Sequence, residues 1–285
     1  LGLTRAAAQA IGDSRNPLLI THELRDLLAQ RIYAMCCGYE DLNDHTSLRE
    51  DVLMQTAVGV KDTMASSPTL CRLENRTARW QSVALHGVLV DQFIASHEHA
   101  PERIVLDIDA SDQQRSEFHA YYDHHCYLPL YVFCGQAMLV CYLRNSKIDG
   151  AKHAGAVMRL LINRIRRSWP AVKIVVRGDS GFCRQGLIRW CERSGVSYVI
   201  GLARNRRLED TVAMVEVAMA EAYRRSGVKQ REIGEFRYAA ESWDRERRVV
   251  TRLEYGNQGV NPRFVVTNLQ EPGEQLYDEI YCARG

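Results

Sequence analysis

Two short runs of the chain end in carboxylates directly after an apolar segment. The first is Leu106-Asp107-Ile108-Asp109, and the second is Val175-Val176-Arg177-Gly178-Asp179. Side chains alternate along a strand with a period of two, so Asp107 and Asp109 share one strand face. Ligands of open α/β sheets collect at the carboxyl ends of strands, where carboxylates from adjacent strands can share a hard divalent cation. The sequence therefore predicts a metal site formed by Asp179 with Asp107 or Asp109.

Each motif also has a purely local interpretation. Asp179 or Ser180 fits the N-cap of a following helix, and Asp109 or Asp112 fits an Asx turn. Sequence alone does not show whether the two strands are neighbours. The glycines on either side of Asp179, Gly178 and Gly181, indicate a place where a phosphate backbone approaches the chain closely.

The charge of the chain is unevenly distributed. The formal net charge is only +2 over 285 residues. Residues 144–252 contain 24 basic and 12 acidic residues, however, whereas the rest of the chain contains 13 basic and 23 acidic residues. A basic stretch beside an acidic remainder is typical of a face that binds a polyanion.

Arginines in this basic stretch are candidate phosphate contacts. They are Arg164, Arg166, Arg167, Arg177, Arg204, Arg206 and Arg207. A run of arginines is also compatible with a solvated helix face. Together with carboxylates of the metal-binding type, the basic stretch favours nucleic acid over a small anionic substrate.

Other chemistry finds less support in the sequence. His124-His125-Cys126 has no second ligand pair at a spacing suited to zinc. The Tyr121, Tyr122, Tyr127 and Tyr131 cluster fits strand and loop packing better than a base-stacking platform. The nine cysteines are scattered without a C-x-x-C pair, as is typical of reduced thiols in a cytoplasm. No apolar stretch approaches 18 residues, so no membrane partner is expected.

The order of elements predicts an α/β fold. Residues 1–100 show helical periodicity, for example at Leu24, Leu27, Leu28 and Ile32. Strands are predicted at 104–108, 127–133, 138–143, 174–176 and 198–202, with helices at 151–168, 184–193 and 212–224. Further strands are predicted at 235–239, 248–255 and 263–267, and a helix begins near residue 274. Alternating strands and helices imply parallel pairing in a mixed sheet.

Three longer motifs carry a family resemblance. They are Gly38-Tyr39-Glu40-Asp41-Leu42-Asn43-Asp44-His45, Ser66-Ser67-Pro68-Thr69-Leu70-Cys71-Arg72-Leu73-Glu74-Asn75 and Tyr121-Tyr122-Asp123-His124-His125-Cys126-Tyr127-Leu128-Pro129-Leu130-Tyr131. Together with the two aspartate motifs, in this order over nearly the whole chain, they resemble a bacterial insertion-sequence DDE transposase.

The resemblance implies a ribonuclease-H-like mixed sheet with flanking helices, an N-terminal helical region and a β-rich insertion. The expected segments are a helical DNA-binding region at 1–100, the catalytic core at 101–230, the β insertion at 231–270 and the start of the final core helix at 271–285. In that family two aspartates and a glutamate hold two Mg²⁺ ions for strand cleavage and strand transfer. Asp109 corresponds to the first aspartate, with Asp107 as the alternative, and Asp179 to the second.

The resemblance also implies double-stranded DNA with terminal inverted repeats as partner, a homodimer in the transposition complex, and a bacterial cytoplasmic protein at the nucleoid. Two departures from the family pattern stand out. The family's glutamate follows a motif like Tyr281-Cys282-Ala283-Arg284-Gly285, so we expect the chain to belong to a longer reading frame. The segment between Asp112 and Tyr121 is shorter than in relatives.

Two other functions stay open at this point. One is a DNA-binding transposase remnant without catalysis, which the missing glutamate favours. The other is a small-molecule phosphatase or metal hydrolase on an α/β sheet, which explains the carboxylates but not the excess of arginine. Strong salt dependence of DNA binding distinguishes a nucleic-acid partner from a small substrate.

Overall fold

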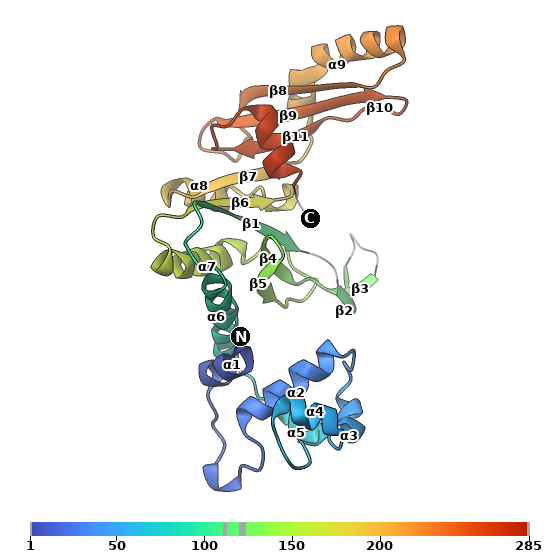
Figure 1. The fold of residues 1–285 in the computed structure, drawn as a ribbon. Coiled ribbons are helices and arrows are strands. Elements are labelled where there is room, and N and C mark those ends of the chain that lie inside the picture. The colour runs from blue at the N-terminus through green and yellow to red at the C-terminus, as the bar shows by residue number, and fades with distance from the viewer. Residues whose placement is uncertain (1, 111–112, 120–123, 284–285) are drawn as a thin grey trace. The chain divides into compact units, whose positions relative to one another are not determined.

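The computed structural model describes residues 2–110, 113–119 and 124–283, and for residues 113–119 and 124–126 it describes the backbone alone. The chain divides into two compact units, Leu1–Ser96 and His97–Gly285 (Figure 1). The predictions for Asp112, for the Tyr121-Tyr122 pair and for the side chains of His124-His125-Cys126 lie outside this described part.

The first unit consists of helices, as its periodicity predicts. They are α1 (Leu3–Ile11), η1 (Pro17–Leu19), α2 (Leu24–Cys36), η2 (Leu42–Asp44), α3 (His45–Leu48), α4 (Val52–Val58), α5 (Ser67–Asn75) and α6 (Arg79–Ala95). Asn16, Asp41 and Asp51 cap η1, η2 and α4 by accepting hydrogen bonds from backbone N–H groups of the first turn. Leu24 and Leu27 of α2 pack against Leu70 and Leu73 of α5 in one apolar cluster.

A buried polar pair sits inside this unit. The side chain of Gln30 bridges two segments, because its Nε2 donates to the carbonyl of Ala65 at 2.9 Å and its Oε1 accepts from the Ala65 N–H at 3.1 Å. The same Nε2 lies 3.1 Å from Nδ1 of His45, which is fully buried. Since Nε2 of Gln30 is a donor, Nδ1 of His45 must accept, and the imidazole is neutral.

The second unit is built on one nine-stranded mixed sheet. Its strands are β1 (Arg103–Ala110), β4 (Leu130–Cys134), β5 (Ala137–Tyr142), β6 (Lys173–Gly178), β7 (Ser197–Leu202), β8 (Gln230–Tyr238), β9 (Arg247–Gly256), β10 (Gly259–Val260) and β11 (Arg263–Thr267). The order along the sheet is β10-β9-β11-β7-β6-β1-β4-β5, with β8 paired to β9. Strands β2 (Gln113–His119) and β3 (His124–Tyr127) form a separate hairpin.

Strand directions decide which loops meet. Strands β1, β6 and β7 are parallel neighbours, and β4 runs antiparallel to β1. Because β5 is antiparallel to β4, it runs in the same direction as β1. The order β5-β4-β1-β6-β7 is the ribonuclease-H-like arrangement that the resemblance implies, and the α/β fold class with a mixed sheet is confirmed.

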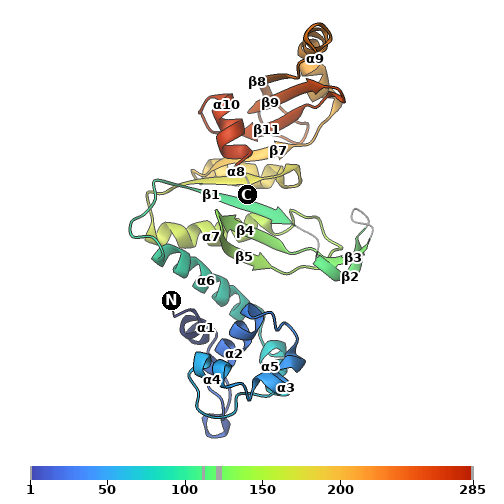
Figure 2. The same cartoon turned by 45° about the vertical axis from the view of Figure 1, so that its right-hand side comes forward.

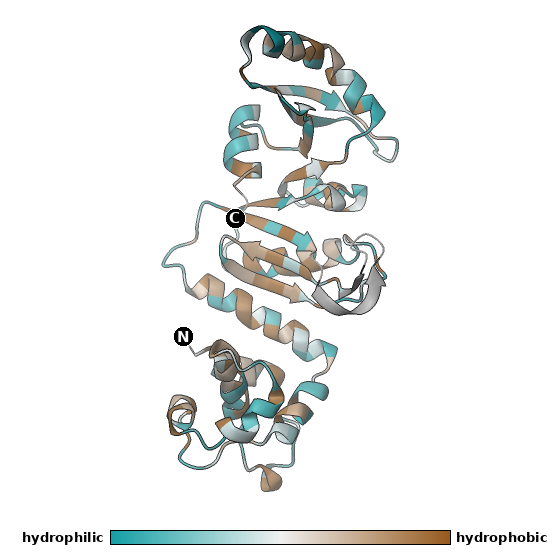
Figure 3. Cartoon of the chain, turned by 90° about the vertical axis from the view of Figure 1, so that its right-hand side faces the viewer, coloured by the Kyte–Doolittle hydropathy of each residue, from teal (hydrophilic) through white to brown (hydrophobic). Residues whose placement is uncertain are grey.

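The two faces of the sheet are covered by different helices. Val175, Val199 and Val265 point to one face, where they pack against Leu276 and Ile280 of the C-terminal segment. This segment comprises α10 (Gly273–Gln275) and the π-helical turn η4 (Leu276–Tyr281), and Figure 2 shows α10 beside β11. Alternate residues such as Leu106 and Val176 are fully buried on the opposite face. Figure 3 shows the apolar residues concentrated in these central strands.

Three longer helices connect the strands of this unit. They are α7 (Ala154–Ser168), α8 (Gln185–Arg193) and α9 (Arg206–Ser226). The first two match the predicted helices, whereas α9 begins six residues before the predicted start at 212. Asn205 explains the earlier start, because its side chain accepts from the Leu208 N–H and caps the helix. Gly227, in the left-handed conformation, ends it.

The strands of the predicted β insertion do not form a sheet of their own. β11 pairs antiparallel with β7, from Phe264↔Leu202 to Thr267↔Val199, and β9 pairs with β11. The segment 231–270 therefore extends the core sheet by continuous main-chain hydrogen bonding, with α9 packed against β8 and β9.

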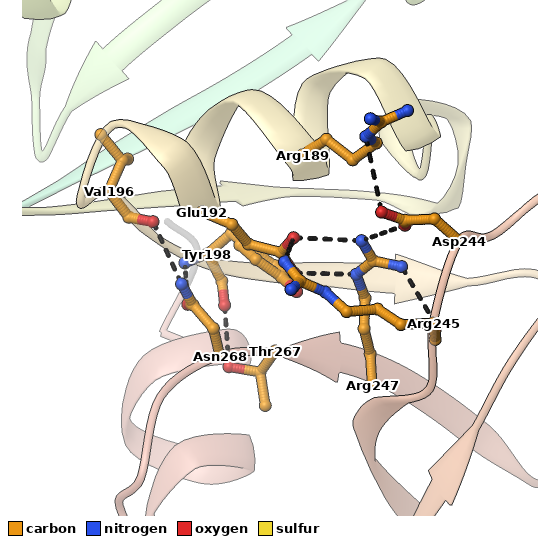
Figure 4. A network of polar contacts seen from close by, with 9 residues as sticks. All are labelled: Arg189, Glu192, Val196, Tyr198, Asp244, Arg245, Arg247, Thr267 and Asn268. Carbon is orange, nitrogen blue, oxygen red and sulfur yellow. Dashed lines mark hydrogen bonds and ion pairs between the residues drawn. The ribbon is translucent and has the colours of Figure 1, made fainter.

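A network of hydrogen bonds and ion pairs connects the start of β9 with α8 and β7 (Figure 4). Glu192 of α8 accepts two hydrogen bonds from Arg247, at 2.8 and 3.0 Å, and further ones from Arg245 and from the hydroxyl of Tyr198. Arg247 also donates to Asp244 at 2.9 Å. Burial would raise the pKa of the Glu192 carboxyl, but the hydrogen bonds from Arg247, Arg245 and Tyr198 outweigh it and lower that pKa.

The cysteines whose side chains are described carry no disulfide. In the part of the chain that the structure describes, no helix combines the length and apolar character needed to cross a membrane.

Acidification should destabilise the first unit through His45. Burial, reinforced by the charge of Arg31, lowers the pKa of His45 below 6.5, so the unfolded chain binds a proton that the folded chain rejects. We expect the free energy of unfolding to fall as pH drops below about 6.5, by at most about 1.4 kcal/mol per pH unit. Hydrogen exchange of the α2 amides between pH 7.5 and 5 measures this.

His45→Leu should remove this part of the pH dependence, whereas His99→Leu, at an exposed position, should retain it. An unchanged slope in His45→Leu contradicts the prediction.

Removing the carboxylate at the centre of the network should destabilise the second unit. Glu192→Gln leaves the guanidinium of Arg247, which is 3% exposed, without its main counter-charge. We expect a loss of about 2 to 4 kcal/mol in the free energy of unfolding. Glu221→Gln, which breaks an exposed pair with Arg225, should cost less than about 0.5 kcal/mol. Denaturant unfolding of both variants makes the comparison, and equal losses refute the prediction.

Candidate active site

The two aspartate motifs meet at one edge of the sheet. Strands β1 and β6 are adjacent and parallel, and their last paired residues are Ile108 and Gly178. Asp109 and Asp179 are the next residues of the two strands. Neighbouring strands lie about 4.8 Å apart, so the two aspartates stand side by side. They also share a face, because Val105 and Val175, four positions earlier on each strand, both pack against the C-terminal segment. The edge formed by the carboxyl ends of β1, β5, β6 and β7 is called the carboxyl edge below.

Asp107 has a different role from Asp109. It lies opposite Arg177 in the register of β1 and β6. Both of its carboxylate oxygens accept hydrogen bonds from Arg177, one at Nε and one at Nη2, the latter at 2.6 Å. A carboxylate with both oxygens bound to a guanidinium is neutralised and poorly suited to a metal ion. The geometry therefore favours Asp109 over Asp107 as the partner of Asp179.

Arg177 is not a surface residue, which corrects its prediction as a DNA contact. Its side chain is 7% exposed, and its Nη1 donates to the carbonyl of Ile280 in η4. One guanidinium thus joins β1, β6 and the C-terminal segment directly beneath the two aspartates. Arg177 and Asp179 are two residues apart and share a strand face, but Arg177 lies beneath the C-terminal segment, whereas Asp179 follows the end of the strand and is exposed.

The loop after β6 holds Asp179 in place. Oδ1 of Asp179 accepts the Gly181 N–H at 2.8 Å, and this hydrogen bond caps the short helix η3 (Ser180–Phe182). The predicted N-cap interpretation of Asp179 is confirmed, and it does not compete with a site role because a carboxylate has further lone pairs. The side chain itself is exposed at the carboxyl edge.

The glycines near Asp179 are closely packed against neighbouring protein atoms. A Cβ on Gly181 would lie 3.0 Å from Oδ1 of Asp179, and one on Gly178 would lie 3.0 Å from Cγ2 of Ile108. The tightest position is Gly201 on β7, where a Cβ would lie 2.9 Å from the Ser180 N and 2.8 Å from the Tyr281 hydroxyl. Gly201 therefore lets the Asp179-Ser180 turn and Tyr281 lie against β7.

Asp109 has an aromatic neighbour on the other side. Tyr131 of β4 is its partner in the antiparallel register. Burial raises the pKa of the Tyr131 hydroxyl, and neighbouring Cys141 raises it further. The phenol is therefore neutral at physiological pH, so it adds no negative charge beside the carboxylates.

The predicted arginine contacts divide between the two edges of the sheet. Arg204, Arg206 and Arg207 follow β7 at the carboxyl edge and are exposed. Arg204 donates to Oδ1 of Asn261 at 2.7 Å, and the guanidinium of Arg207 lies 5.6 Å from the ring centre of Tyr238. These arginines are on the same edge as Asp109 and Asp179.

The second arginine set lies at the opposite edge. Arg164, Arg166 and Arg167 occupy the C-terminal turns of α7, and Arg166 donates to the carbonyls of Ser194 and Gly195, which precede β7. These residues therefore lie at the edge opposite the two aspartates, and their role as phosphate contacts stays a prediction. A helix that returns antiparallel to its strands necessarily ends at the edge where the next strand begins.

Among the described residues, no larger cluster of metal-binding side chains is present. A cavity of about 400 Å³ lies at the edge opposite the aspartates, between Glu102, Lys173 and Ser197. Within residues 2–110 and 127–283, whose side chains are described, no group of three or more His, Cys, Asp or Glu residues is placed to hold a metal ion. Asp109 and Asp179 are thus the candidate metal-binding carboxylates among the residues that the structure describes.

Comparison with known proteins identifies the family. The sequence model of the family "Transposase DDE domain group 1" matches residues 1–285. The chain belongs to this family of DDE transposases. No curated protein matches the sequence.

Two solved structures show weaker similarity. One is the piggyBac transposase in a synaptic complex with hairpin DNA, with a TM-score of 0.42 and 11% identity. That match covers 94% of this chain, but the chain spans only 58% of the piggyBac transposase chain. The other is the Argonaute of Marinitoga piezophila with a guide RNA and target DNA, with a TM-score of 0.30, 11% identity, and coverage of 71% of this chain and 30% of that one.

Sequence reasoning missed two residues that shape the site. Gly201 has no motif around it, and only the crossing of the Asp179 turn over β7 reveals its importance. Arg144, discussed below, follows β5, and its place at the carboxyl edge depends on the direction of β5. The parallel alignment of β5 with β1 follows from two antiparallel pairings, of β4 with β1 and of β5 with β4.

Adding a methyl group at Gly201 should disturb the Asp179 turn. Gly201→Ala should lower the free energy of unfolding by about 1 to 3 kcal/mol, because the new Cβ overlaps backbone atoms of Ser180 and Asp179. Hydrogen exchange at Gly181 and Phe182 should also accelerate. Gly186→Ala in α8 is the matched control, since a Cβ there meets no atom within 4 Å and alanine favours a helix. A Gly201→Ala variant as stable as wild type would refute the close approach.

Proposed function

We propose that the chain performs DNA strand cleavage and strand transfer at the ends of an insertion sequence, by Mg²⁺-dependent phosphoryl transfer with two metal ions in the complete active site. The observation that carries the proposal is the position of Asp109 and Asp179 directly after Ile108 and Gly178, the last paired residues of two adjacent parallel strands. Membership of the DDE transposase family supports it.

The residues present fit a hard divalent cation. Carboxylate oxygens are the donors that Mg²⁺ prefers, and Asp109 and Asp179 present them on one face of the carboxyl edge. Asp107 is held by Arg177, so it adds no uncompensated charge next to them. When bound, Mg²⁺ activates the attacking oxygen and stabilises the leaving oxygen of the phosphodiester. Asp109 and Asp179 would hold it, and η3 and Gly201 fix the orientation of Asp179.

The partner that we propose is double-stranded DNA carrying terminal inverted repeats. Arg204, Arg206 and Arg207 would contact its phosphates, because they are exposed at the same edge as the aspartates. The helical region at 1–100 is the proposed DNA-binding region, as the family resemblance implies. A homodimer is the proposed assembly in the transposition complex.

Loss of either aspartate should abolish cleavage. We expect Asp109→Asn and Asp179→Asn to reduce Mg²⁺-dependent cleavage of a terminal-inverted-repeat duplex by at least about 100-fold, since each removes a ligand worth several kcal/mol in the transition state. Glu241→Gln, an exposed carboxylate change in the loop before β9, should retain activity. Activity that persists in both aspartate variants overturns the proposal.

Measuring DNA affinity in the same variants separates the alternatives. Tight, salt-dependent binding with no cleavage in wild type supports a DNA-binding protein without catalysis. Hydrolysis of a small phosphate ester with no salt-dependent DNA binding supports a small-molecule phosphatase.

A further inference from the structure

The loop between β5 and α7, residues 143–153, lies beside the candidate active site. Because β5 runs parallel to β1, the loop leaves the sheet at the carboxyl edge. A Cβ on Gly150 would lie 3.7 Å from Cβ of Ala110, the residue after Asp109. Asp149 forms an ion pair at 2.5 Å with Arg184, which follows η3 and Asp179. The loop therefore touches the segments that follow both candidate aspartates.

A buried arginine shapes this loop. Arg144 is 5% exposed and makes no ion pair with a carboxylate in the described chain. Instead, its Nε donates to the carbonyl of Leu128 at 2.8 Å, and its Nη1 donates to the carbonyls of Gly150 and Lys152 at 3.0 and 2.6 Å. Three main-chain carbonyls from two segments are thus fixed by one guanidinium.

The position of Arg144 is energetically unusual. Burial lowers the pKa of Arg144, and its Nη2 is buried without a hydrogen-bond partner among the described residues. A buried cation without a counter-ion costs several kcal/mol, and anions nearby reduce that cost. The loop is therefore held in place by a positive charge that an approaching anion would stabilise.

The outer side of the loop is also basic. Lys147 and Lys152 are exposed, and Arg184 contacts the same loop through its ion pair with Asp149. Residues 143–153 and Arg184 together carry four cationic side chains, those of Arg144, Lys147, Lys152 and Arg184, and one carboxylate, that of Asp149, which accepts from Arg184 and from the Ala151 N–H. Lys152 follows Gly150 by two residues, a chain length of at most about 7 Å, so it lies close to the end of β1.

We propose that loop 143–153 is a phosphate-binding wall of the active site, in which Lys147 and Lys152 contact the backbone of the DNA strand that passes Asp109 and Asp179, and Arg144 is the positioning residue. The inference rests on the proposed function. It names a second basic surface at the carboxyl edge, on the side of β1 opposite Arg204, Arg206 and Arg207. The sheet order β5-β4-β1-β6-β7 places the two aspartates between the two surfaces.

An extended surface of this kind suits a polymer. Exposed lysines spread along a loop bind successive phosphates through long-range attraction, whereas a single small phosphate needs convergent donors in a pocket. DNA is therefore the ligand class that the loop fits.

The test measures DNA binding without divalent cations, so that it does not depend on catalysis. A Lys147→Ala/Lys152→Ala variant should bind a terminal-inverted-repeat duplex at least tenfold more weakly at about 0.1 M salt, and its slope of log affinity against log salt should fall by about 2. The matched control is Arg224→Ala/Arg225→Ala, which removes the same charge about 27 Å along α9 from its first residue. The control should keep the wild-type slope.

Arg144→Gln tests the positioning role. Arg144 is buried and does not itself reach the DNA, so the proposal expects its variant to lose part of the salt slope as well as protection of the 143–153 amides from hydrogen exchange. A wild-type salt slope in the lysine variant, or an equal loss in the control, overturns the proposal. That result is distinguishable from failure of the proposed function, which Asp109→Asn and Asp179→Asn test through cleavage. If Arg144→Gln does not fold, the lysine variant still decides.

Discussion

The ion pair between Asp107 and Arg177 is the interaction on which the organisation of the second unit depends. A guanidinium buried between strands and helix must find its counter-charge and its acceptors within the protein, because desolvation of an unpaired cation costs several kcal/mol. Arg177 meets this demand with the carboxylate of Asp107 on the neighbouring strand and the carbonyl of Ile280 in η4. These partners fix the register of β1 against β6 and the position of the C-terminal segment at once.

This register has a direct result one residue further along each strand. Since Asp107 lies opposite Arg177, Asp109 and Asp179 must emerge together on the same face of the sheet. A shift of one residue would turn one of them into the opposite face. Asp109 and Asp179 are thus aligned by the ion pair between Asp107 and Arg177. This pair is shielded from solvent, and its two charges neutralise each other. The sheet thereby separates an aspartate that is bound by a buried arginine from the candidate site aspartate two residues away.

Much of the fold follows from local patterns in the sequence. The apolar segments of β1 and β6 and the alternating order of strands and helices predict the mixed sheet, and the aspartates at strand ends predict where chemistry could occur. Long-range facts are beyond such patterns. Nothing local to Arg177 indicates its burial, because its partners lie 70 and 103 residues away. The separation of the α7 arginines from those after β7 likewise depends on helix direction rather than on charge.

The extension of the core sheet by later strands has a consequence for synthesis of the protein on the ribosome. The face of the sheet that carries Val105, Val175 and Val199 is covered by residues 269–280, and the outer edge of β7 is completed only by β11. While the nascent chain is shorter than this, an apolar face and an unpaired strand edge are both exposed. Asp109 and Asp179 therefore reach their final alignment only late in translation. A chain interrupted before Ile280 lacks the carbonyl group to which Arg177 donates, and this contact helps to align the two aspartates.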